Sequence, residues 1–233
     1  CKRAREGHPL AHAAGQLAGV LVARAVEFHA TQPVKRRATR LGLGLVEDHL
    51  HLQRGLGDFQ AAVLAIVRCP IPVLAVVEGT AAGFGLDLAL ACDLRLAGGD
   101  ATFTSAFARM GLVPDGGSTW LLARAIGRAR ATRMMMLGEK IGAEQAEDWG
   151  LIYKAVDDAT LMDEALALAT KLSQGPTVSY STMKANIQTA LDGTLSQVLL
   201  AEAEGQRVAG ASADAMEGGL AFIQKRKAEF KGR

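Results

Sequence analysis

The order of apolar and polar positions along the chain predicts strands that are followed by helices. Residues 72–77 are almost entirely apolar and rich in β-branched side chains, which is typical of a strand covered on both faces. A glycine-bearing turn follows at residues 79–85, and residues 86–92 have room for about two helical turns. Residues 102–104 predict another short strand. This succession is typical of an α/β protein.

Helical spacing dominates on both sides of this region. Apolar residues at Phe59, Val63 and Ile66 predict a helix that ends before Pro70. Further on, a helix is expected to open near residue 118, to run to about Ile126 and to stop at Gly127. A strand is expected at residues 151–156. The remaining helices are expected at residues 158–173, 176–191, 194–209 and 212–227.

Composition adds limits to this picture. The chain has 233 residues, 49% hydrophobic content and a formal net charge of +2, which suits one substantial core. No apolar run approaches the about 20 residues that a membrane helix needs, and no signal peptide opens the chain. We therefore expect a soluble, cytoplasmic protein that does not bind a membrane. Nucleic-acid binding is not expected either, because no aromatic residues interleave with the basic ones.

The first 57 residues differ from the rest of the chain. They carry nine Lys/Arg against four Asp/Glu, and all five histidines lie between positions 8 and 51. The strongest helical pattern in this front segment covers residues 10–26. His49 and His51 lack a third ligand nearby, so no metal site is predicted.

The turn at residues 79–85 is the clearest candidate for chemistry. A strand, a glycine turn and a helix start point backbone N–H groups at one place, where they can bind a phosphate or a developing oxyanion. Gly83 and Gly85 lack the third glycine of a dinucleotide-binding fingerprint, and no Gly-Lys-Ser/Thr follows. An oxyanion hole is the remaining interpretation.

Two stretches of the sequence resemble a known protein family. The chain from about residue 58 to its end resembles the crotonase (enoyl-CoA hydratase/isomerase) superfamily, in EGTAAGFGLDLALACDLRLA and in FARMGLVPDGGSTWLLARAIGRARA. Within it, GLVPDGGSTWLL and AEQAEDWGLIYKAVDD are most similar to 1,2-epoxyphenylacetyl-CoA isomerase-like members. The resemblance implies a fold of repeated β-β-α units, a C-terminal helical trimerisation tail, and a homotrimer or hexamer.

The resemblance also implies a substrate and a set of roles. The substrate would be an acyl-CoA thioester, so coenzyme A belongs to the substrate and no separate cofactor is expected. The N–H of Phe84 would stabilise the enolate and Asp115 would move the proton, while Asp87 would be a secondary catalytic group. A hydratase would need a second carboxylate where this chain has Phe107. The implied substrate-binding residues are Ala82, Gly83, Ala106, Phe107, Met110 and Pro114.

Several alternatives stay open at this point. Asp115 could be the N-terminal cap of the next helix, a common use of aspartate. The protein could be an enoyl-CoA hydratase, or an inactive member that binds CoA or an assembly partner. The second oxyanion donor normally comes from a small-residue loop near the front, and residues 41–45 are the one glycine-bearing candidate.

Three regions are therefore predicted. Residues 1–57 form an atypical or truncated front that does not match the usual start of the family. Residues 58–157 form the crotonase-like core with the acyl-CoA site, and residues 158–233 form the helical oligomerisation region.

Overall fold

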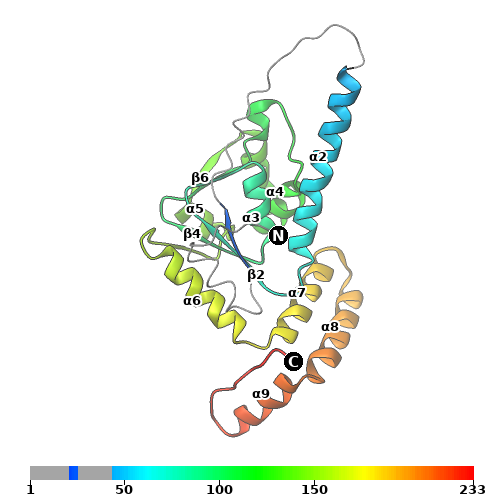
Figure 1. The fold of residues 1–233 in the computed structure, drawn as a ribbon, viewed down its shortest axis with the longest axis vertical. Coiled ribbons are helices and arrows are strands. Elements are labelled where there is room, and N and C mark those ends of the chain that lie inside the picture. Colours follow the sequence, from blue (N-terminus) through cyan, green and yellow to red (C-terminus); the bar gives the residue numbers. More distant parts are fainter. Residues whose placement is uncertain (1–20, 26–43) are drawn as a thin grey trace. The chain divides into compact units, whose positions relative to one another are not determined.

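A computed structural model describes residues 21–25 and 44–233, with side chains from residue 56 onward. The described chain forms two compact units, whose elements are labelled in Figure 1. The mixed unit takes in the described parts of Arg24–Arg68 and all of Val77–Asp158. The helical unit consists mainly of Ala159–Arg233, with Cys69–Val76 and the described part of Cys1–Ala23.

The mixed unit alternates short strands with helices. Its elements are α2 (Gly44–Val67), β3 (Thr80–Ala82), α3 (Phe84–Ala91), β4 (Leu94–Gly98), β5 (Thr102–Thr104), the 3₁₀ helix η1 (Phe107–Met110), α4 (Ser118–Met136), β6 (Lys140–Gly142), α5 (Ala143–Asp148) and β7 (Lys154–Val156). With β2 (Val73–Val77), the chain twice passes through two strands and then a helix, as β2-β3-α3 and β4-β5-α4. The expected α/β architecture of repeated β-β-α units is confirmed.

Parallel pairing brings the turns of successive repeats together. β3 and β5 are parallel, with Ala82 opposite Thr104, and β6 adds an antiparallel third strand. β4 and β7 form a second parallel pair. Because β3 and β5 are parallel, the turns that follow them, at Gly83 and at Ser105, leave the same edge of the sheet. The core residues of this unit that are less than 2% exposed include Leu86, Leu96, Phe103, Leu122, Met134, Ile141 and Leu151.

Most predicted helices and strands of this unit are present, with changes at their ends. The helix predicted to end before Pro70 is much longer than expected, since α2 begins at Gly44. α2 runs without a break across the predicted domain boundary at residues 57/58. The boundary itself stays a prediction. The stop at Gly127 is confirmed, because α4 is kinked there with φ 78° and ψ 158°.

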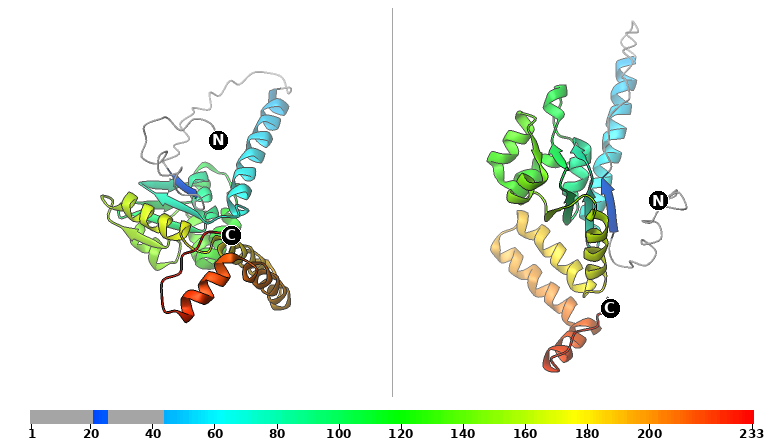
Figure 2. Two further views of the ribbon diagram at one scale, coloured as in Figure 1. Left: turned by 60° about the horizontal axis from the view of Figure 1, so that its bottom comes forward. Right: turned by 90° about the vertical axis from the view of Figure 1, so that its left-hand side faces the viewer.

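The helical unit is built around four helices, α6 (Leu161–Ser173), α7 (Thr177–Asp192), α8 (Leu195–Gly210) and α9 (Ala213–Ile223). α7 and α8 are joined by a tight turn and lie side by side in both views of Figure 2, as an antiparallel hairpin. The hydroxyl of Thr194 caps α8 and forms a capping box with Gln197, which fixes where α8 begins.

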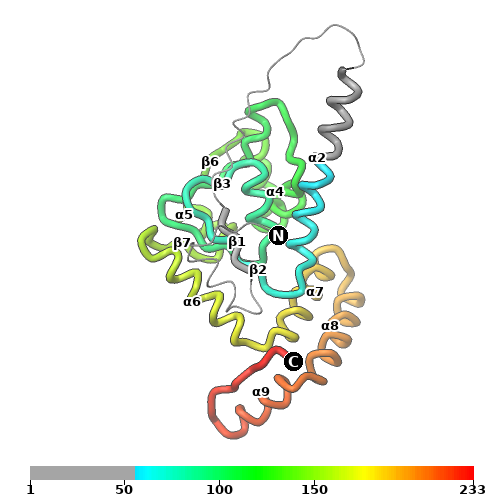
Figure 3. The backbone as a smooth tube through the Cα atoms, in the orientation of Figure 1, coloured from blue at the N-terminus to red at the C-terminus, as the bar shows by residue number. Residues whose placement is uncertain are grey.

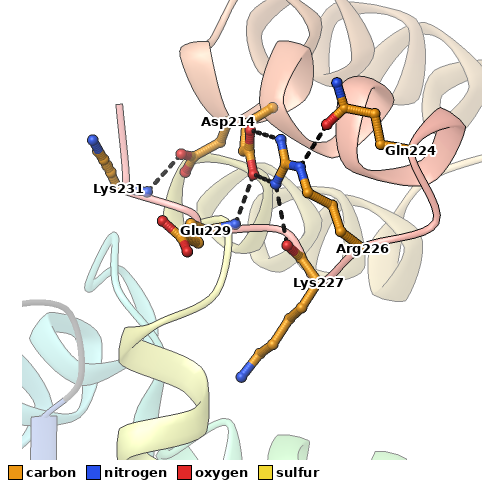
Figure 4. A network of polar contacts seen from close by, with 7 residues as sticks. Asp214, Gln224, Arg226, Lys227, Glu229 and Lys231 are labelled. Carbon is orange, nitrogen blue, oxygen red and sulfur yellow. Dashed lines mark hydrogen bonds and ion pairs between the residues drawn. The ribbon is translucent and has the colours of Figure 1, made fainter.

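The last helix is shorter than the predicted range of residues 212–227. α9 ends at Ile223, Lys225 takes a left-handed conformation with φ 51°, and the chain turns back along α9 (Figure 3). The carboxylate of Asp214 accepts hydrogen bonds from the backbone N–H groups of Lys231 and Gly232, at 2.6 and 2.8 Å. Figure 4 shows the contact between Lys231 and Asp214, together with the Arg226 guanidinium, which donates to Glu217 and to Gln224 Oε1.

The helix predicted at residues 10–26 is wrong at its end, because Leu21–Ala25 forms a strand, β1, which lies beside β2. β-Branching and alternation are weak in this segment, so pairing with β2 decides its conformation. Residues 41–43 of the candidate second loop lie outside the described residues, and Gly44 already belongs to α2. No helix in the described residues has the length and apolar character needed to cross a membrane.

Candidate active site

The turn after β3 presents the start of α3. Gly83 has φ 54° and ψ −123°, a conformation that glycine adopts without strain, and its N–H donates to the carbonyl of Thr104 at 3.1 Å. The Gly83 carbonyl then accepts from Leu86 and Asp87. Because Phe84 is the first helical residue, its N–H has no partner within the helix and is available to a ligand.

A second turn lies beside this helix start. Ala106 takes a left-handed conformation with φ 58° and is followed at once by η1, in which Phe107 is only 6% exposed. A Cβ placed on Gly83 would lie 3.7 Å from the Phe107 ring, so the ring packs over the Gly83 turn. Met110, at the end of η1, is 61% exposed. Its assignment as a substrate-binding residue stays a prediction.

The third turn runs from Pro114 to Gly117 and carries Asp115. Both Pro114 and Asp115 are half-buried, and the side chain of Gln60 on α2 donates to the backbone carbonyl of Asp115 at 3.1 Å. The cap of α4 is Gly117, without a side-chain capping bond. Asp115 is thus not the helix cap, and its carboxylate is not committed to that structural role.

Asp87 joins the first turn to the third. It lies in the first turn of α3 and is fully buried, and its Oδ2 accepts the N–H of Gly116 at 3.1 Å. A Cβ on Gly116 would lie 2.4 Å from that oxygen, so only glycine permits this approach. The other oxygen, Oδ1, has no hydrogen-bond partner among the described residues, and neither has the buried hydroxyl of Ser118.

This environment raises the pKa of Asp87 from 3.8 to about 6. Burial is the largest cause, because it disfavours the charged carboxylate, and the nearby charge of Asp115 acts in the same direction. The Ser118 hydroxyl and the Gly116 N–H lower the pKa in part. The Ser118 hydroxyl thus lies near enough to influence the carboxyl, although it forms no hydrogen bond of ordinary geometry with it.

The other end of α3 is held by Arg95. Its guanidinium donates to the carbonyl of Cys92 at 2.7 Å and to that of Leu151 at 2.6 Å. Burial lowers the pKa of Arg95 from its usual value, while Asp93 and Cys92 favour its charged form. Several backbone carbonyls at the C-terminal end of the helix are satisfied in this way, which fixes the helix that presents Phe84 and Asp87.

Aromatic rings gather on one side of the helix start. The ring of Phe59 on α2 lies 4.6 Å from that of Phe84, centroid to centroid, with the planes tilted by 39°. The sequence pattern placed Phe59 on one face of a helix and Ser118 in a turn, and it assigned neither residue to the site. Nothing short of the folded chain would have selected either residue.

The three turns therefore supply a backbone N–H donor and two carboxylates that influence each other. Phe84, Asp87 and Asp115 all lie in this group, and so do Ala82 and Gly83 at the end of β3. This set can stabilise an oxyanion and exchange protons. The described residues contain no group of three His, Cys, Asp or Glu side chains placed to hold a metal ion.

Comparison with known proteins shows which family the chain is similar to. The model of the enoyl-CoA hydratase/isomerase family matches residues 49–233. The 1,2-epoxyphenylacetyl-CoA isomerase of Escherichia coli (strain K12) is 44% identical over 175 residues, which cover 75% of this chain and 67% of that protein. The probable enoyl-CoA hydratase of Rhodobacter capsulatus is 43% identical over 194 residues, covering 83% of this chain and 75% of the relative.

Solved structures agree with the fold. The enoyl-CoA hydratase of Bacillus anthracis superposes with a TM-score of 0.80 at 25% identity, covering 96% of this chain and 88% of that one. An enoyl-CoA hydratase from Polaromonas sp. JS666 gives 0.74 at 35% identity, covering 78% and 71%. The resemblance seen in the sequence is confirmed, and the chain belongs to the enoyl-CoA hydratase/isomerase, or crotonase, family.

Proposed function

We propose that this protein acts on an acyl-CoA thioester as an isomerase, moving a proton along the acyl chain through a stabilised enolate. The N–H of Phe84 would bind the thioester oxygen as it gains charge, a contact typically worth about 3 kcal/mol of barrier. Asp115 would remove a proton from one carbon and return it to another. A 3-enoyl-CoA or an epoxyphenylacetyl-CoA are the candidate substrates, and the isomerase relative supports this class.

The observation that carries the proposal is the contrast between Phe107 and Asp115. Phe107 is buried beside the Gly83 turn, where a phenyl ring can neither hold nor deliver a proton. Asp115 lies on the neighbouring turn and is not used as a helix cap. A single carboxylate is sufficient for a double-bond shift, because the proton that leaves is the proton that returns.

A hydratase is the second candidate, and Asp87 favours it. A carboxyl with a pKa of about 6 can both give and take a proton near neutral pH, which addition of water requires. The hydratase relative supports this alternative. In that case Asp87 and Asp115 would act as the two carboxylates.

We also propose that the protein assembles through its helical unit, as a homotrimer or hexamer. Large apolar residues are exposed on α7, α8 and α9, and a groove of about 810 Å³ lies along α7 and α8. Such residues require a partner surface. We also propose that the protein is located in the cytoplasm.

Replacement of Asp115 by Asn tests the chemistry. The amide keeps the shape of the carboxyl and removes the base, so turnover of a 3-enoyl-CoA should fall by about 10²- to 10⁴-fold with little change in CoA-ester binding. Steady-state kinetics and calorimetric titration with a non-reacting CoA ester would measure the two effects. Gly57→Ala on the exposed face of α2 is the control, since nothing lies within 4 Å of the added methyl.

Three outcomes separate the candidates. Isomerisation that depends on Asp115 supports the proposal. Ready hydration of crotonyl-CoA, with Asp87→Asn the more damaging change, would establish the hydratase instead. Tight binding of CoA esters without any turnover would identify an inactive binding member of the family.

A further inference from the structure

One peptide group of the Asp115 turn is held from two sides. Its carbonyl, that of Asp115, accepts a hydrogen bond from the Gln60 side chain on α2 at 3.1 Å. Its N–H, that of Gly116, donates to Asp87 Oδ2 on α3 at 3.1 Å. Both atoms belong to the same planar peptide bond. Two helices therefore hold one rigid plane, the first through its acceptor and the second through its donor.

This peptide plane sets the direction of the Asp115 side chain. The plane follows the Asp115 Cα directly, so the orientation of the plane relative to that residue is its ψ angle. Any large rotation about ψ would break both hydrogen bonds at once. On the α3 side, Asp87 is fully buried and approaches so closely that Gly116 has no room for a Cβ. Gln60 supplies the matching restraint from the α2 side.

The face of α2 that carries Gln60 also reaches the other parts of the site. Val63 is 7% exposed, and it is the one buried residue among the side chains of α2 that the structure describes. A Cβ on Gly117 would lie 3.8 Å from Val63, which therefore packs beside the turn that carries the proposed base. Phe59, one helical turn earlier, contacts the ring of Phe84. α2 thus touches both the start of α3 and the neighbouring turn.

We propose that Gln60 is a positioning residue for Asp115, through which α2 sets where the proton-transferring carboxylate lies relative to the Phe84 N–H. A neutral amide suits this role, because it binds the main chain and adds no charge beside the carboxylate. The kinetic consequence of the inference rests on the proposed function. Its structural content, the hold of Gln60 on the peptide between residues 115 and 116, does not depend on the reaction.

Amide hydrogen exchange followed by NMR tests the structural content without any need for activity. Gln60→Met keeps a long side chain of similar helix preference and removes the donor. The Gly116 N–H should then exchange about 2- to 10-fold faster, as expected when one hydrogen bond of the plane is lost. Gln145→Met makes the same substitution at an exposed position of α5 and should leave that rate unchanged. Equal exchange of Gly116 in the two variants would overturn the inference.

Kinetics test whether Gln60 acts through Asp115. Gln60→Met should lower kcat by about 2- to 10-fold at unchanged KM, because a loosely held base slows proton transfer without weakening binding. In the Asp115→Asn background the same change should cause no further loss, since the carboxylate that Gln60 positions is already gone.

Two kinetic results would contradict the positioning role. One is an equal fold loss of kcat in both backgrounds, and the other is a raised KM at unchanged kcat. If the wild type shows no isomerisation, the proposed function fails, and the exchange of Gly116 still decides whether Gln60 holds the turn.

Discussion

Among the residues whose side chains the structure describes, each unit buries one aspartate, and the two aspartates have opposite surroundings. In the helical unit, Asp214 is 2% exposed and its two oxygens accept two backbone N–H groups of the C-terminal tail. In the mixed unit, Asp87 is 0% exposed, accepts one N–H and leaves its second oxygen without a partner among the described residues. Stability accounts for the first arrangement. The second arrangement leaves a buried polar atom unpaired, which costs free energy.

Apolar residues show the reverse contrast. The mixed unit has a core of fully buried apolar side chains, whereas α7 buries none of its residues and α8 buries only Gly205. Leu200 and Phe222 are 73% and 85% exposed. The buried polar atoms without a partner, among the described residues, all lie in the mixed unit, whereas α7 and α8 of the helical unit bury almost no apolar side chain. The first feature supports the proposed site, and the second supports the proposed assembly surface.

The largest expected effect is on assembly. Leu200→Glu places a charge in the apolar surface of α8 and should convert a trimer or hexamer to monomers, because an unpaired charge in an interface is strongly unfavourable. Light scattering at micromolar concentration measures the mass. Ser196→Glu adds the same charge at an exposed polar position of α8 and should leave the mass unchanged. A wild-type protein that is already monomeric would contradict the proposal.

The next effect concerns Asp87 and pH. Because its pKa is higher in the fold than in the unfolded chain, its contribution favours folding below pH 4 and is lost as the pH rises through about 6. Asp87→Asn removes this loss, so at pH 8 the variant should be more stable than the wild type by up to about 3 kcal/mol. Urea unfolding at pH 4 and pH 8 measures the difference. An equal effect at both pH values would exclude a raised pKa.

Asp214→Asn should act in the opposite direction. The amide group turns a donor toward a tail N–H that needs an acceptor, which typically costs about 1–3 kcal/mol. The same unfolding experiment measures the loss, and hydrogen exchange should show earlier opening of residues 229–233. Asp163→Asn, in the exposed first turn of α6, is the matched control for both aspartates. A loss no larger than that of the control would show that the tail contacts carry little energy.

The smallest effect tests how closely Asp87 approaches the Asp115 turn. Gly116→Ala places a methyl group 2.4 Å from Asp87 Oδ2 and should destabilise the fold by about 1–3 kcal/mol through overpacking. Gly57→Ala, in the helix α2, should instead stabilise it by about 0.5–1 kcal/mol. Thermal unfolding of the two variants gives the comparison. Similar stabilities would mean that the turn yields easily and holds Asp115 loosely.

The sequence alone determined much of the local structure and the family. A continuous apolar run predicted β2, and helical periodicity placed the last helices to within a few residues, because these signals depend on neighbours in the chain. The order of strand, turn and helix pointed to the Gly83 turn, and the resemblance to the family implied the role of Phe84, which stays a prediction. The family followed from phrases spread over the same region, and the comparisons confirm it.

Tertiary structure decided what the sequence left ambiguous. An aspartate in a helical turn can be a cap, a solvated charge or a buried acid, and only the approach of Gly116 makes Asp87 the third of these. Asp115 lost its role as a cap in the same way, because the chain enters α4 through Gly117. The C-terminal tail left its predicted helix since Asp214 offers its backbone better partners than another helical turn would. In each case contacts between residues distant in sequence outweigh a local preference of about 1 kcal/mol or less.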